Sequence, residues 1–263
     1  MRLPAIILCA FIPSAFAAYG YESRLWPDTI YVYDRENVDV DSLGRTYIVL
    51  EGDTIHTSFI PRVDFIHAGP LREEDFREIA KELDIETAAI KAVVDIETGK
   101  TRRGLNGPEF PVINFDQALF RRAAARRGIS LARHSSSDAL KSVNIRKYGS
   151  QQKAQKARLD AAMLIDSVAA MESTFWGMFQ IGGFNWELSG AASRQEFMEL
   201  MGRSEYDQLR LFANYVRNTG LLKYLKTKNW AAFARVYNGP SYAARGYHTR
   251  LAAAYRRHKK EEK

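Results

Sequence analysis

The stretch that decides the fold is AVVDIETG, residues 92–99. Apolar side chains at Ile90, Val93 and Val94 lead to Glu97 at positions i, i+3, i+4 and i+7. This spacing is that of one face of an α-helix, and the glycine that closes the stretch is a common helix terminator. The pattern therefore predicts a helix whose apolar face ends on a glutamate.

A glutamate in this position is expected to have unusual acid–base chemistry. Burial and the negative end of the helix dipole both disfavour the carboxylate, so the pKa of Glu97 should be raised. A carboxylic acid that keeps its proton near neutral pH can donate it to a departing sugar oxygen. The structural alternative is that Glu97 reaches solvent at the helix end, or pairs with Arg102 or Arg103.

A second informative stretch is TFWGMFQIGG, residues 174–183. Its apolar side chains are predicted to anchor the start of a helix, and its glycines allow the backbone to approach a ligand. Gln180 offers a donor and an acceptor for the hydroxyl and acetamido groups of a sugar. The alternative is a buried aromatic cluster in which Gln180 only satisfies backbone groups.

A third stretch, WAAFARVYNGP at residues 230–240, predicts a helix that ends in a turn. Tyr237 and Asn238 place a hydroxylated aromatic ring beside an amide, which suits the floor of a sugar-binding cleft. The alternative is that Asn238 serves only the turn.

The chain from Glu73 onward is predicted to be helical. Ile79 and Leu83 mark a first amphipathic helix, and Asp84 is expected to cap a second one that begins near Glu86. Further helices are expected at residues 115–127, 153–171, 194–202, 204–226, 228–237 and 241–257. The polar segment 130–150 is predicted to be a loop, and the charged run 256–263 a solvated tail.

Residues 18–70 have a different pattern. β-branched and aromatic residues at 46–50 and 54–60 flank a turn that contains Gly52, which is typical of a hairpin. We expect a small β-containing extension that packs on a main domain at residues 71–258. A wall-binding role is the alternative, and residues 259–263 are expected to form a charged tail.

The first 17 residues have the pattern of a signal peptide, with Arg2, a short apolar run and the sequence AFA ending at Ala17. The alternative is a buried N-terminal helix. Cleavage near Ala17 predicts export to the periplasm or the extracellular space. Cleavage would also remove Cys9, the sole cysteine. The formal net charge of +7 is suited to polyanionic partners, namely nucleic acid, anionic lipid or cell-wall polymers, and export makes nucleic acid the least suitable of these. The alternative is that the charge only aids solubility.

Together these stretches resemble the N-acetylmuramidase family of phage endolysins and bacterial wall hydrolases. The similarity covers residues 73–258 and is carried by five segments: 92–99, 114–116, 158–171, 175–185 and 230–240. It implies a mostly α, lysozyme-like helical domain beside the β-containing extension. It also implies an enzyme that cuts the β-1,4 bond between N-acetylmuramic acid and N-acetylglucosamine in peptidoglycan.

The resemblance implies roles for particular residues. Glu97 is the expected catalytic acid, and Thr98, Phe115, Gln180, Tyr237 and Asn238 are expected to contact the glycan. Thr98 stands where the family usually has Ser.

The segment that follows Phe115 departs from the family pattern. Where the family tends to have Phe-Glu-x-His, this chain has Phe115, Asp116, Gln117 and Ala118. Asp116 is therefore the first candidate for a second, water-activating carboxylate, with Asp166 and Glu172 in reserve. The alternative for Asp116 is a helix N-cap.

Two rival functions remain open at this point. A lytic transglycosylase shares the same motifs but forms anhydro-muramic acid products, and a catalytically silent wall-binding protein needs no acid at all. The five histidines show no metal-ligand spacing, so neither a metal nor a cofactor is expected. The expected partner is the peptidoglycan glycan strand, bound by a monomer without stable membrane insertion.

Overall fold

The computed structural model describes the backbone of residues 29–32, 38–40, 46–50, 53–56 and 62–65, and the complete residues 70–98, 103–107 and 110–262. The chain divides into two compact units between Gly69 and Pro70. The expected signal peptide, Gly99 and Arg102 lie outside the described residues.

The first unit contains short β-strands. Strand β1 (Thr29–Val32) pairs in parallel with β5 (Arg62–Phe65). Strands β2 (Val38–Val40), β3 (Thr46–Leu50) and β4 (Asp53–His56) form an antiparallel sheet. The β3–β4 pairing is the hairpin that the sequence predicts.

The second unit is mostly α-helical, as expected, with a small three-stranded sheet. Its elements in chain order are α1 (Glu73–Leu83), α2 (Thr87–Thr98), β6 (Ile113–Phe115), α3 (Gln117–Arg126), α4 (Ile145–Tyr148), α5 (Gln151–Met163), α6 (Ser167–Glu172), β7 (Thr174–Trp176), β8 (Ile181–Gly182), α7 (Arg194–Arg203), α8 (Glu205–Asn218), α9 (Leu222–Lys226), α10 (Trp230–Tyr237) and α11 (Tyr247–Glu261). Short 3-10 helices occupy residues 131–134, 138–140, 183–185 and 240–242. Within the described residues, no helix is long and apolar enough to cross a membrane.

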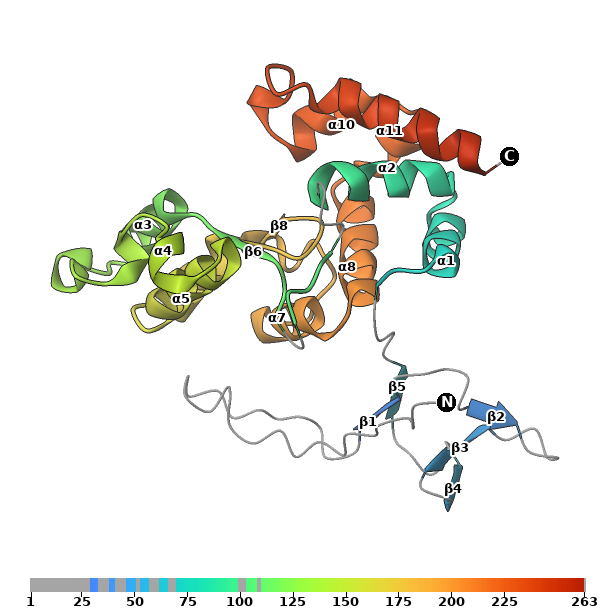
Figure 1. The fold of residues 1–263 in the computed structure, drawn as a ribbon, viewed down its shortest axis with the longest axis horizontal. Coiled ribbons are helices and arrows are strands. Elements are labelled where there is room, and N and C mark those ends of the chain that lie inside the picture. The colour runs from blue at the N-terminus through green and yellow to red at the C-terminus, as the bar shows by residue number, and fades with distance from the viewer. Residues whose placement is uncertain are drawn as a thin grey trace. The chain divides into compact units, whose positions relative to one another are not determined.

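The antiparallel sheet β6–β7–β8 lies in the middle of this unit. In Figure 1 it lies between the group formed by α3, α4 and α5 and the long helix α8, while α10 and α11 run beside α2. The carboxyl end of α2 therefore comes close to segments that follow it by more than a hundred residues.

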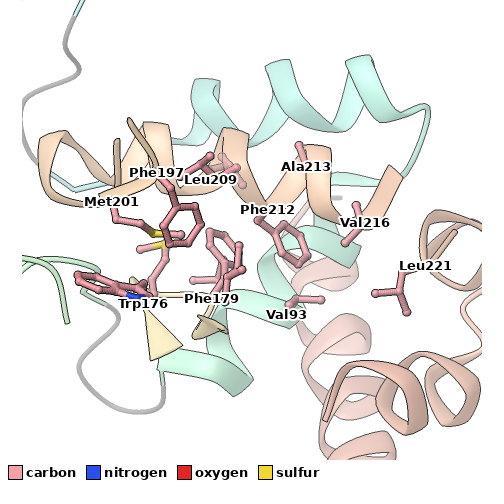
Figure 2. Close-up of a cluster of buried hydrophobic side chains, with 14 of the residues drawn as sticks. Val93, Trp176, Phe179, Phe197, Met201, Leu209, Phe212, Ala213, Val216 and Leu221 are labelled. Carbon is pink, nitrogen blue, oxygen red and sulfur yellow. The ribbon is translucent and has the colours of Figure 1, made fainter. Parts of the chain in front are cut away.

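The core is built on aromatic side chains from the sheet region and α8. Phe179 stacks on Phe212 with ring centroids 4.3 Å apart, and Trp176 meets the edge of Phe197 at 6.4 Å. Val93 of α2 packs into the same cluster (Figure 2). Burial of this apolar face stabilises α2 and holds its last turn at the edge of the core.

Several predicted helix boundaries are wrong, and local capping explains the differences. Asp84 adopts a left-handed conformation with φ of 54° and ends α1 instead of beginning α2. The helix expected at 153–171 is split because Asp166 caps α6 and accepts a hydrogen bond from the Ala169 N–H at 2.7 Å. The helix expected at 204–226 is interrupted near Gly220, whose φ is +71°.

The predicted solvated tail is correct in part: most of the described residues from 256 to 262 are exposed, but they belong to α11, which continues to Glu261. His258 is buried, and its Nε2 atom lies 2.7 Å from the Asp95 carboxylate. Lys259 forms an ion pair with Glu86 at 2.7 Å. The charged run therefore pairs with carboxylates of the α2 region and fixes the position of α2.

Two other segments differ from expectation. The predicted loop 130–150 contains two 3-10 helices and α4. Residues 174–182 form the hairpin β7–β8 and not the start of a helix. The turn of this hairpin needs positive φ at Gly177 (69°) and Gln180 (49°), which a helix does not allow.

Candidate active site

A cavity of about 300 Å³ opens at the carboxyl end of α2. It is bordered by β6, by the first turns of α5 and by the turn between β7 and β8. Most of its lining is polar, and the lining includes Glu97, Thr98, Arg103, Asn114, Gln152 and Gln180. The cavity therefore offers many hydrogen-bonding groups beside one carboxyl group.

Glu97 lies in the last turn of α2, half-buried at the cavity wall. Burial raises the pKa of its carboxyl group to about 7, although a hydrogen bond from Asn238 and the positive charge of Arg250 act in the opposite direction. Desolvation thus outweighs both favourable contacts. At neutral pH a substantial fraction of Glu97 keeps its proton and can donate it.

Two residues at the end of α10 hold the groups around Glu97. Asn238 donates from Nδ2 to Glu97 Oε1 at 2.8 Å. Tyr237 donates from its hydroxyl to the carbonyl oxygen of Phe179 at 2.6 Å, and its ring stacks on Phe233 at 5.2 Å. Burial raises the pKa of Tyr237, so its hydroxyl remains a donor. The end of α10 thus connects α2 to the β7–β8 turn.

Gln180 and Thr98 line the cavity but use part of their polar side chains internally. Gln180 donates from Nε2 to the carbonyl oxygen of Gly177 at 2.9 Å and thereby braces the turn. Thr98 donates from Oγ1 to the carbonyl oxygen of Val94 at 2.6 Å. These internal hydrogen bonds fix the positions of both side chains in the cavity wall.

Phe115 has a different position. Its side chain is 2% exposed and packs against Phe120 with ring centroids 5.5 Å apart. It lies in the core behind the cavity and is not part of the lining.

The candidate second carboxylates are engaged elsewhere. Asp116 caps α3 and accepts a hydrogen bond from the Leu119 N–H at 2.9 Å. Asp166 caps α6 and pairs with Arg127, and Glu172 pairs with Arg194. Among the residues that the structure describes, Glu97 is the only carboxylate in the cavity lining.

The sequence interpretation did not identify Gln208, a buried glutamine that joins three backbone segments beside the cavity. Gln208 accepts a hydrogen bond from the Met178 N–H at 2.7 Å and donates to the carbonyl oxygens of Gly104 (3.1 Å) and Met201 (2.7 Å). It is fully buried on α8. The available signal was an amide three residues before Leu211 on an apolar helix face.

A second missed group consists of amides on β6 and α5, namely Asn114, Gln152 and Gln155. Their signal was weaker, since the glutamines are separated by three positions on a polar-looking helix. No group of three or more His, Cys, Asp or Glu residues suited to a metal occurs within the part of the chain that the structure describes.

The arrangement suits acid catalysis on a polar polymer. One carboxyl group with a pKa near neutrality faces a cavity lined by amides, and the backbone around it is braced by buried hydrogen bonds. Such a site can protonate an ether-type oxygen and bind hydroxyl and amide groups around it.

Comparison with known proteins finds a family and a solved structure similar to this chain. The family model for N-acetylmuramidase matches residues 86–259. Among solved structures, the crystal structure of Burkholderia AP3 phage endolysin is similar, with a TM-score of 0.62 and 33% sequence identity over 73% of this chain and 72% of that chain. None of the curated proteins matches the chain.

Proposed function

Because the chain belongs to the N-acetylmuramidase family and is a peptidoglycan-degrading glycoside hydrolase, we propose that Glu97 is its general acid. We propose further that the bond cleaved is the β-1,4 linkage between N-acetylmuramic acid and N-acetylglucosamine. The observation that carries the proposal is the position of Glu97 in the cavity wall, with a pKa raised to about 7.

The proposed reaction begins when Glu97 donates its proton to the glycosidic oxygen. The bond from this oxygen to the sugar carbon breaks, its electron pair stays on the departing oxygen, and an oxocarbenium-like centre forms. Asn238 then stabilises the carboxylate that remains on Glu97, because its Nδ2 donor is already in contact with Oε1. Water then bonds to the cationic sugar carbon, and the proton that this water loses returns to the Glu97 carboxylate, which restores the acid.

We infer that the glycan occupies the cavity beside Glu97. Thr98 and Gln180 line this cavity, which supports direct contact with the sugar. Tyr237 and Asn238 affect the cavity indirectly. Tyr237 binds the carbonyl oxygen of Phe179, and Asn238 binds the Glu97 carboxyl group. The buried position of Phe115 supports an indirect role, in which it holds β6.

A second reaction course deserves a direct test because Glu97 is the sole carboxylate lining the cavity in the described residues. A lytic transglycosylase does not need a second carboxylate, since the substrate's own hydroxyl captures the cation. Mass spectrometry of the products separates the two outcomes. Reducing muramic acid indicates hydrolysis, and anhydro-muramic acid indicates transglycosylation.

The test of the proposed function is cell-wall clearing by wild type and Glu97→Gln. Glutamine preserves the shape of the side chain but cannot donate a carboxylic proton, so clearing should fall by about two to four orders of magnitude. Glu187→Gln is a matched control, because Glu187 is exposed and outside the cavity lining. Clearing by folded Glu97→Gln at the wild-type rate would overturn the assignment.

We also propose that residues 1–17 are a cleaved signal peptide and that the mature monomer acts on the wall outside the cytoplasm. The apolar run and the AFA sequence before Ala18 support this proposal. Amino-terminal sequencing of the exported protein should find a start near Ala18. An intact amino terminus in the cytosolic fraction would contradict it.

A further inference from the structure

Two consecutive hydrogen bonds form a chain that connects the buried Arg158 to the cavity wall. Arg158 donates to Gln155 Oε1 at 3.2 Å, and Gln155 donates from Nε2 to Asn114 Oδ1 at 2.9 Å. Arg158 and Gln155 are only 6% and 4% exposed. Water therefore cannot easily replace either partner.

The arginine determines the direction of the whole chain. A guanidinium group has donors and no acceptor, so Gln155 must turn its oxygen towards Arg158. The NH₂ group of Gln155 then faces Asn114 and donates to the Asn114 side-chain oxygen. As a consequence, the NH₂ group of Asn114 remains available to donate a hydrogen bond to a molecule in the cavity.

The backbone keeps Asn114 in this position. Asn114 is the middle residue of β6 and is exposed, whereas its neighbours Ile113 and Phe115 are buried on the other face. The side chain of Gln152 fixes β6 through Ile113. It accepts a hydrogen bond from the Ile113 N–H at 2.9 Å and donates one to the Ile113 carbonyl oxygen at 3.1 Å. Asn114 therefore lines the same cavity as Glu97 on a braced strand.

We propose that Asn114 is a specificity residue whose Nδ2 group donates to the carbonyl oxygen of a 2-acetamido group on the bound glycan. A hydroxyl group can rotate to donate or accept and does not need a donor of fixed direction. An acetamido carbonyl can only accept, and it matches an NH₂ group that cannot turn away. The proposal rests on the proposed function, since it places the glycan in the cavity beside Glu97.

Asn114→Asp tests the donor directly. Gln155 can still donate to one oxygen of the new carboxylate, while the other oxygen faces the cavity in place of the NH₂ group. Binding of chitotetraose should weaken by about tenfold or more, because a donor facing a carbonyl becomes an acceptor. Binding of the fully deacetylated tetramer should strengthen, because its ammonium groups can donate to a carboxylate.

Asn144→Asp is the matched control. Asn144 caps α4, is exposed and accepts a hydrogen bond from the Lys147 N–H at 2.9 Å, which aspartate also accepts. The control makes the same change in net charge outside the lining of the Glu97 cavity. It should leave the ratio of the two affinities unchanged.

Gln155→Glu tests the role of the chain without changing Asn114. A carboxylate between Arg158 and Asn114 can only accept, so the Asn114 amide must flip and turn its oxygen to the cavity. The variant should shift the preference for acetylated over deacetylated tetramer in the same direction as Asn114→Asp. The two substitutions together should shift it no further than Asn114→Asp alone.

The readouts separate this inference from the proposed function. Isothermal titration with the two tetramers reports binding, and clearing of N-acetylated and enzymatically deacetylated walls reports turnover. An unchanged preference in folded Asn114→Asp overturns the inference, even where wild type clears walls. A shifted preference supports it even where Glu97→Gln still clears walls, which would overturn only the proposed role of Glu97.

Discussion

Asn238 Nδ2 donates a hydrogen bond to Glu97 Oε1 at 2.8 Å, and the two residues are 141 positions apart in the chain. The Oδ1 atom of the same amide is buried and has no hydrogen-bond partner among the described residues. The contact lowers the pKa of Glu97 but does not compensate for the desolvation that raises it. Asn238 therefore limits the rise in the pKa of Glu97 that burial causes.

Replacing Asn238 by leucine should move the activity profile to higher pH. Loss of the donor removes an interaction that favours the carboxylate, so the pKa of Glu97 rises further above about 7. The alkaline limb of the profile of kcat/KM against pH reports this pKa in the free enzyme. That limb should shift upward, while a shift towards acid pH would contradict the role assigned to Asn238.

Glu97→Gln should stabilise the protein at alkaline pH and have little effect on stability at acid pH. The folded-state pKa of about 7 exceeds the ordinary value of 4.5, so stability is lost as pH rises from about 4.5 to 7. Above this range the ionised Glu97 costs up to about 3 kcal/mol, which the neutral glutamine avoids.

Thermal unfolding at pH 4 and pH 8 measures this difference. The melting temperature of Glu97→Gln should exceed that of wild type at pH 8 and equal it at pH 4. Glu187→Gln, which alters an exposed carboxylate, should show no such difference. Equal melting temperatures at pH 8 would mean that burial of the ionised Glu97 carboxylate does not destabilise the fold.

Substitutions at Asp116 should separate capping from chemistry. Asparagine keeps an oxygen that can accept from the Leu119 N–H, so Asp116→Asn should retain stability and most of the turnover. Asp116→Ala should lower the free energy of unfolding by about 1 kcal/mol through loss of the α3 cap. A hundredfold fall in turnover of Asp116→Asn at unchanged melting temperature would instead assign it a role in activating water.

Gln208→Leu should destabilise the second unit strongly. The substitution leaves the Met178 N–H and the carbonyl oxygens of Gly104 and Met201 without their buried partner. Each unsatisfied group costs about 1–3 kcal/mol, so the loss should be at least about 3 kcal/mol in urea unfolding. Asn218→Leu is a milder control, because Asn218 makes a single exposed hydrogen bond to the Leu188 carbonyl.

Features that depend on a few neighbouring residues were predictable. The apolar spacing that ends on Glu97 predicted α2, and the β-branched runs around Gly52 predicted the β3–β4 pairing. The three motifs and their order along the chain were enough to predict the N-acetylmuramidase family, and the family match confirms this prediction. Errors arose where capping decided between one helix and two, as at Asp166.

Longer-range chemistry depended on the folded chain. From sequence alone Asp116 could be a catalytic group or a cap, and only the structure shows its carboxylate bound to the Leu119 N–H, outside the cavity lining. Similarly, nothing in the sequence near Asn114 indicates that Gln155 and Arg158 orient its amide.

The sequence by itself therefore determined the mostly helical fold, the family and the identity of Glu97 as the candidate acid. Tertiary structure alone decided the pKa of that acid, its contact with Asn238 and the direction in which Asn114 presents its donors. The physical reason is the range of the interactions. Helical periodicity and capping act over a few residues, whereas desolvation and hydrogen-bond partners arise only when distant segments pack together.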